Sequence, residues 1–182
     1  MSDESGPSVL RLIEDSLALT RAGASDPVLV IALTWAGLIR ARTGDLPGAL
    51  AVLPEAMARH HGDGNRLLLG GTLQVAAGVL ARLGEAEPAA VLSGAFSAHF
   101  PPDISAVHQN VKMGIGEAQS LARHALGEAA YGAALGRGAA MDDDEVVGYA
   151  LGEFRRLAAQ RAEPRAQAPE SPPGPARPSR RE

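Results

Sequence analysis

The chain of 182 residues has no cysteine, which excludes disulfide bonds, thiol catalysis and cysteine-ligated metal clusters. Aromatic residues make up only 3% of it, whereas a β-sandwich or barrel needs aromatic and β-branched side chains to cover its pleated faces. Lys112 is the single lysine, and the formal net charge of -4 makes the whole chain a poor generic binder of nucleic acid. Alanine is the commonest residue, which favours closely packed helices.

Long hydrophobic runs are also missing. The longest strongly apolar stretch covers 28–39, about a dozen residues where a membrane span needs about 20. The first residues, Met1 to Ser5, are acidic and polar, unlike a secretory signal peptide. We therefore predict a cytoplasmic protein that has no membrane segment.

Helical periodicity, interrupted by glycine and proline, predicts about seven helices in a domain at 7–161, after a disordered stretch at 1–6. The expected helices cover 7–22, 27–43, 47–60, 66–83, 87–99, 104–125 and 141–160, with a short one at 128–135. Leu126-Gly127-Glu128 should end or bend the sixth helix, and Gly136 and Gly138 should lie behind the short one. No part of the sequence shows the alternation of a strand.

The last part of the chain has a different composition. It contains six prolines and little that is apolar beyond alanine: Pro164, Pro169, Pro172, Pro173, Pro175 and Pro178. Such a segment cannot bury enough apolar surface to offset the entropy lost on ordering, so we predict a disordered linker or tail at 162–182. Its terminal arginines would contact phosphate only weakly and in a salt-dependent manner.

Two stretches of the sequence resemble each other at a shift of 40 positions. The shift places Leu33 on Leu73, Ala36 on Ala76, Gly44 on Gly84, Asp45 on Glu85 and Ala49 on Ala89. These are small or apolar residues where two antiparallel helices meet, with a glycine at the bend. The pattern is typical of helical hairpins that stack on their neighbours.

The first unit resembles the tetratricopeptide repeat. It has Gly37 in the first helix, the turn Gly44-Asp45, and Ala49 and Ala56 in the second helix. The second unit departs from that pattern, because Ala77 replaces the helix glycine and large aromatic residues are missing. The resemblance implies an all-α, tetratricopeptide-like antiparallel helical-repeat solenoid.

A second resemblance rests on Glu87–Ala95, Phe100-Pro101-Pro102, Ala125-Leu126-Gly127, Gly136-Arg137-Gly138 and Met141–Ala150. Over about 27–152 the chain resembles the C-terminal end of the helical-repeat region in actinobacterial LuxR-type and related NTPase-coupled transcriptional regulators. In that family a Pro/Ala-rich linker leads into a helix-turn-helix domain, and 178–182 resembles its first residues. The NTPase and the recognition helix have no counterpart here, so no nucleotide-binding or DNA-reading residue is implied.

These features predict a non-enzymatic interaction or sensor module with no catalytic residue, cofactor or metal. Its partner would be a protein segment or effector in a groove along the first helices of the pairs, near Trp35, Leu38, Arg42, Gln74 and Arg82. This chain alone should not bind a specific nucleic acid, and an exposed end helix would favour a homodimer. Two alternatives stay open: a truncated regulator remnant with no independent activity, and a small helical ligand-binding protein or enzyme.

Two polar clusters are better explained by structure than by metal chemistry. His60-His61 with Asp63 could suggest a metal site, but adjacent helical side chains point in different directions. The acidic run 142–145 lacks the alternating ligands and central glycine of a calcium loop, so it is expected to cap the last helix. Trp35 and Phe96 are expected in the core or in the groove, and burial is the favoured interpretation.

Overall fold

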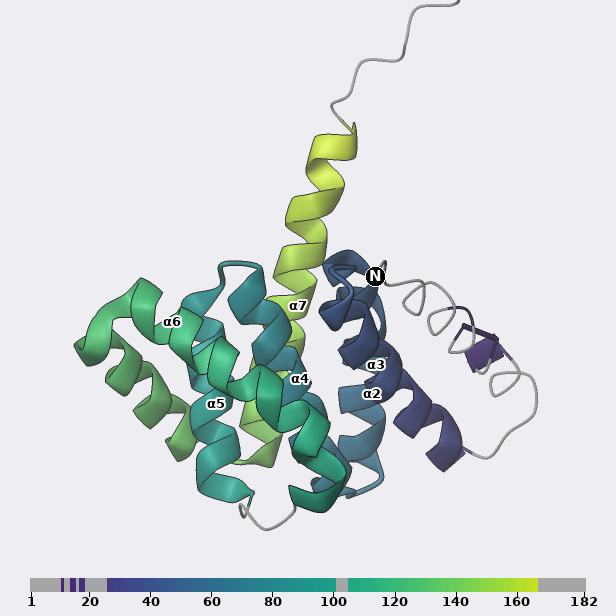
Figure 1. The fold of residues 1–182 in the computed structure, drawn as a ribbon, viewed down its shortest axis with the longest axis horizontal. Helices are drawn as coiled ribbons and strands as arrows, with labels where there is room; N and C mark the ends of the chain where they lie inside the picture. The colour runs from purple at the N-terminus through teal and green to yellow at the C-terminus, as the bar shows by residue number, and fades with distance from the viewer. Residues whose placement is uncertain (1–10, 12–13, 16, 19–25, 101–104, 167–182) are drawn as a thin grey trace, which may run out of the picture.

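The computed structural model describes residues 11, 14–15, 17–18, 26–100 and 105–166. Over these residues the chain is all-α and contains no strand. Helices that follow one another pack antiparallel (Figure 1). The helices are α2 (Asp26–Arg42), α3 (Leu46–Gly62), α4 (Arg66–Arg82), α5 (Ala86–His99), α6 (Ser105–Ala140) and α7 (Asp143–Ala166). The four helices from α2 to α5 confirm the predicted ones to within two residues at each end, while the predicted helix 7–22 lies largely outside the described residues.

One turn geometry recurs every 20 residues. Gly44, Gly64 and Gly84 have φ angles of 85°, 65° and 83°, a region that costs little for glycine alone. The residue after each glycine is the N-cap of the next helix, and the three N-cap residues have nearly the same backbone angles. Asp45 accepts a hydrogen bond from the Gly48 amide at 2.9 Å, and so provides one of the free helix N–H groups with a partner.

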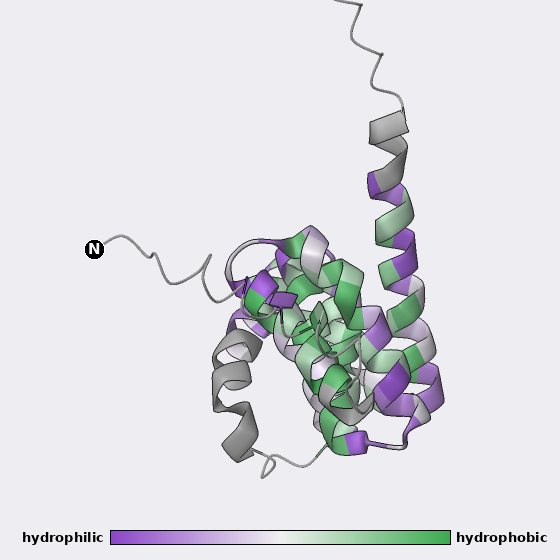
Figure 2. Ribbon diagram, turned by 90° about the vertical axis from the view of Figure 1, so that its right-hand side faces the viewer, coloured by the Kyte–Doolittle hydropathy of each residue, from purple (hydrophilic) through white to green (hydrophobic). Residues whose placement is uncertain are grey.

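Buried core residues also recur along the chain, at twice the spacing of the turns. Leu33 and Leu73, Ala36 and Ala76, and Ala49 and Ala89 are each at most 1% exposed. These pairs are the ones that the 40-residue shift aligns. Apolar residues accordingly gather between the helices, and polar ones lie outside (Figure 2). The two helical pairs therefore use equivalent residues to pack.

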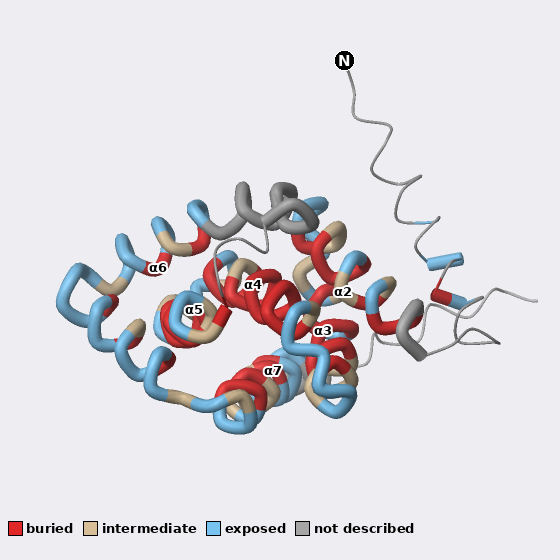
Figure 3. Tube along the Cα trace, turned by 90° about the horizontal axis from the view of Figure 1, so that it is seen from below, coloured by how far each residue is buried: buried red, intermediate tan, exposed pale blue. Residues whose placement is uncertain are grey.

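α6 is divided by a kink at Gly127, whose φ of 75° and ψ of 162° are not helical. We call residues 105–126 its first limb and 128–140 its second limb. The bend predicted at this glycine is confirmed, and it leads α6 around α5 (Figure 3). The prediction that Gly136 and Gly138 lie behind a short helix is wrong, since both lie inside the second limb. Gly138 is needed there for packing, because a Cβ would lie 1.8 Å from the Val91 carbonyl oxygen of α5.

α7 returns to the helical pairs and extends beyond them (Figure 1). The predicted capping role of the acidic run is confirmed. Asp142 Oδ1 accepts from the Glu145 amide at 2.8 Å, and Glu145 Oε2 accepts from the Asp142 amide at 2.9 Å. Phe154 and Leu157 are buried, and the helix ends at Ala166. Residues 167–182 lie outside the described part, so most of the expected tail stays a prediction.

Candidate functional site

The five predicted groove residues divide into buried and open ones. Leu38 and Gln74 are only 8% and 7% exposed, so neither is open to a partner in this structure. Trp35 is 38% exposed and Arg42 is exposed as well. Trp35 and Arg42 lie on α2, whereas Arg82, which is exposed too, lies at the end of α4. The structure therefore does not bring the five side chains together on one surface.

Arg82 connects three helices. Its guanidinium donates from Nη1 to the carbonyl oxygen of Ala41 at the end of α2, and from Nη2 to Glu117 on α6 at 2.9 Å. Its side chain is 30% exposed. The carbonyls at a helix end lack partners within the helix, so this arginine stabilises the end of α2. Arg82 therefore forms contacts between helices of the fold at the position where the groove was predicted.

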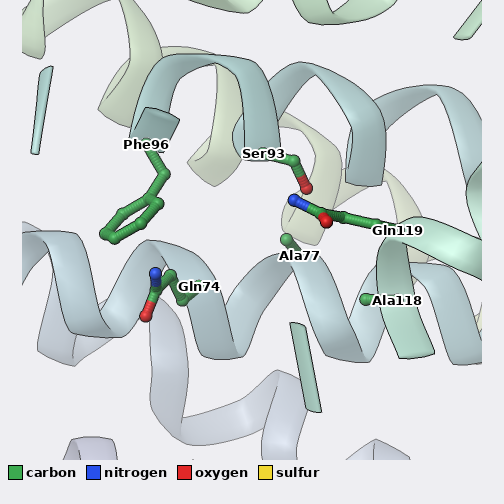
Figure 4. Close-up of a pocket in the computed structure, with 6 residues that line it drawn as sticks. All are labelled: Gln74, Ala77, Ser93, Phe96, Ala118 and Gln119. Carbon is green, nitrogen blue, oxygen red and sulfur yellow. The ribbon is translucent and has the colours of Figure 1, made fainter. Parts of the chain in front are cut away.

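Gln74 lines a small cavity between α4, α5 and α6 (Figure 4). The other lining residues are Ala77, Ser93, Phe96, Ala118 and Gln119. The free volume is about 10 Å³, which is room for one water molecule and too little for an organic effector. The Ser93 hydroxyl already donates to the Ala89 carbonyl at 2.8 Å. Gln74 Oε1 is buried and has no hydrogen-bond partner among the described residues.

A buried polar cluster joins α2, α3 and α4. The Thr34 hydroxyl lies 2.9 Å from that of Thr72 and 3.3 Å from His60 Nε2. His60 is 2% exposed, and this burial lowers its pKa below the ordinary 6.5, although the nearby Asp63 carboxylate acts in the opposite direction. The cluster positions the helices through polar contacts inside the core.

The two adjacent histidines do point in different directions. His60 faces Thr34, whereas His61 Nε2 lies 2.8 Å from Asp144 on α7. In the described part of the chain, no three histidine or carboxylate side chains are grouped so that they could hold a metal ion. His61 therefore connects α3 to the capped start of α7.

Sequence reasoning missed an open hollow of about 650 Å³ at the start of α5. The turn before α5, the kink of α6 and one face of α7 form it, so no local motif could have predicted it. Arg156 pairs there with both Glu85 and Glu153, and Arg137 pairs with Glu87. These carboxylates already have cationic partners, so the hollow joins three parts of the fold through ion pairs.

A tyrosine on the α7 side of the hollow has a shifted pKa. Burial raises the pKa of Tyr149 above its ordinary 10.0, and the Glu153 and Glu87 carboxylates raise it further. Its hydroxyl therefore stays protonated at neutral pH and is no activated base.

Comparison with known proteins gives no identification. No family model, no curated protein and no solved structure matches the chain. In the described ranges no helix is both long and apolar enough to cross a membrane.

The exposed apolar side chains are the remaining candidates for recognition. Within the described residues the large ones are Ile31, Trp35, Leu67 and Leu121. Ile31 and Trp35 are four positions apart on α2 and so lie on the same side of that helix. The expected burial of Trp35 is wrong, because 38% of this residue is exposed. Phe96 is half-buried and stacks on Phe100 with ring centroids 5.5 Å apart.

Proposed function

We propose that this protein is a non-enzymatic interaction module, built like the tetratricopeptide-like repeat region of a LuxR-type regulator. The recurrence of one turn at Gly44, Gly64 and Gly84 carries the proposal. Turns of similar geometry at a fixed spacing set each new helix against the previous one in a similar way. This is how helical solenoids build a continuous surface for partners.

The exposed face of α2 provides a surface for recognition. Aromatic and arginine side chains dominate the binding energy at protein interfaces, and Trp35 and Arg42 lie on this helix, both exposed. The internal cavity at Gln74 holds at most one water molecule, and in the larger hollow at the start of α5 the carboxylates of Glu85, Glu87 and Glu153 are already paired with arginines, so neither offers unpaired charged groups to a small effector. The partner is therefore a protein segment.

Site-specific photocrosslinking in the source cells tests the proposal. Benzoylphenylalanine replaces Trp35 in one variant and the exposed Ala139 of α6 in a control variant. If the protein is an interaction module, the variant at position 35 should cross-link to one dominant protein and the variant at position 139 to none. Equal labelling from both positions, or none from either, would refute it.

The same experiment separates the two alternatives. A regulator remnant with no independent activity predicts no cross-linked partner even when the chain accumulates in the cell. A helical ligand-binding protein or enzyme predicts a small molecule that copurifies with the chain, which native mass spectrometry of the purified protein would detect.

A further inference from the structure

The two ends of the helical stack differ. At the α6 end, residues 116–126 of the first limb bury Ala118 and Ala122, whereas Glu117, Ser120, Arg123 and His124 are exposed. Leu121 is the single large apolar residue that this segment exposes. A polar outer face of this kind closes a stack of helical repeats. At the α2 end, in contrast, Ile31 and Trp35 are exposed.

The repeat relation shows what the open face of α2 is equivalent to. On α4, Thr72 lies against Thr34 of α2 and Arg82 donates to the Ala41 carbonyl, so the side of α4 between these residues faces α2. Val75 and Val79 lie on that same side at helical spacing and are 4% and 0% exposed. α2 therefore covers this side of α4.

A shift of 40 positions transfers that side of α4 onto α2. Ala32, Trp35, Ile39 and Arg42 then take the places of Thr72, Val75, Val79 and Arg82. Trp35 is 38% exposed where Val75 is 4% exposed. Arg42 has no hydrogen-bond partner among the described residues, whereas Arg82 holds the carbonyl at a helix end. We call Ile31, Ala32, Trp35, Ile39 and Arg42 the α2 face.

We propose that the α2 face binds an amphipathic helix of another polypeptide, in the way that α2 itself binds α4. The partner helix places apolar residues on Trp35 and Ile39, and its C-terminal carbonyls accept from the Arg42 guanidinium. This inference rests on the proposed function and specifies the kind of partner.

The fold disfavours the other occupants of this face. The side of α2 that covers α4 includes Thr34, and its equivalent on α4, Gln74, is already buried beside α6. In a second copy the side of α2 that covers α4 is likewise in use, and residues 116–126 of α6 expose no large apolar side chain apart from Leu121, so the free apolar face that remains is the α2 face itself. Pairing of two α2 faces would bury Trp35 in a concentration-dependent dimer, which the test below detects. Leu17 of the N-terminal segment packs instead with Leu29 and Leu33, on a different strip of α2.

The single tryptophan makes the test direct, because Trp35 is the only source of tryptophan emission in the chain. The probe is a synthetic peptide of residues 26–42 carrying Trp35→Phe, since α2 is the helix that covers the equivalent face of α4. Titration of the full-length protein with this peptide should shift the Trp35 emission to shorter wavelength and saturate.

Two pairs of matched variants locate the binding. Ile31→Asp and Arg42→Glu should each weaken peptide binding about tenfold or more. Leu121→Asp and Arg155→Glu make the same changes at exposed positions elsewhere and should leave the affinity unchanged. Circular dichroism checks that all four variants keep the helical fold.

Three results would overturn the proposal: no saturable shift with the peptide, equal weakening by the control variants, or concentration-dependent dimerisation that itself buries Trp35. If position 35 still cross-links to a partner in cells while no helical peptide binds, the interaction module stands and the helical occupant is refuted.

Discussion

The contact between α5 and the second limb of α6 leads to a sharp prediction about two neighbouring glycines. A Cβ added to Gly138 would lie 1.8 Å from the Val91 carbonyl oxygen and 2.9 Å from the Ala95 amide nitrogen. Ordinary contacts begin near 3.4 Å, so the helices would have to separate by about 1.6 Å (3.4 minus 1.8). Backbone atoms cannot rotate away as a side chain can. A Cβ on Gly136, in contrast, would meet nothing within 4 Å.

Gly138→Ala should therefore destabilise the protein while Gly136→Ala stabilises it. Forced overpacking of this kind costs about 1–3 kcal/mol, whereas alanine in place of an exposed helical glycine gains about 0.5–1 kcal/mol. The two variants should differ by about 1.5–4 kcal/mol in the free energy of unfolding. For a chain of this length that corresponds to roughly 3–16 °C in Tm.

Urea unfolding followed by far-ultraviolet circular dichroism measures the difference directly, through midpoints compared at equal slope. Gly94→Ala provides a second test from the opposite helix, because its Cβ would lie 2.1 Å from the Leu135 carbonyl oxygen. If Gly138→Ala is as stable as Gly136→Ala, the close approach of α5 and α6 is not as described, and the reasoning fails.

Three further perturbations follow from single residues. Asp45→Ala removes the acceptor for the Gly48 amide and should cost about 1 kcal/mol in urea unfolding; an unchanged midpoint would show that the cap contributes nothing. Gly127→Ala forces alanine to φ 75°, ψ 162° and should lower the Tm, whereas Gly132→Ala in the exposed part of the second limb should raise it. Burial lowers the pKa of His60, so the neutral form is favoured in the fold and stability should be lost as pH falls below about 6.5. His60→Gln should remove part of that loss between pH 7.5 and 5.5, as measured by urea midpoints, and an unaltered pH dependence would contradict the assignment.

Most of the helices could be predicted from the sequence because their limits are local. Gly44, Gly64 and Gly84 stop helices through their own backbone preference, and Asp142 with Glu145 starts one through its own side chains. Such signals act within a few residues and do not depend on what packs nearby. The same locality explains why the kink at Gly127 could be predicted.

The parts that could not be predicted depend on contacts between distant segments. Gly138 looks like a helix stop in sequence, and only the approach of Val91 shows that it is a contact point inside a helix. The exposure of Trp35 depends on which neighbours α2 has, and composition does not reveal them. The hollow at Arg156 combines three segments, and one of its charge pairs, Arg156 with Glu85, joins residues that are 71 positions apart. The groove residues were chosen from the order of the helices, so the burial of Gln74 beside α6 could not be anticipated.

The return of α7 to α3 has a consequence for how the chain unfolds. A stack in which each helix contacts only its neighbours can lose its units one at a time from either end. Here Asp144 pairs with His61 and Asp143 with Arg66, so the last helix is joined to an early turn. Unfolding of the α2–α3 pair would therefore break the contact between His61 and Asp144 and also destabilise α7. We expect this closure to make the described helices unfold as one cooperative unit instead of a row of separable ones.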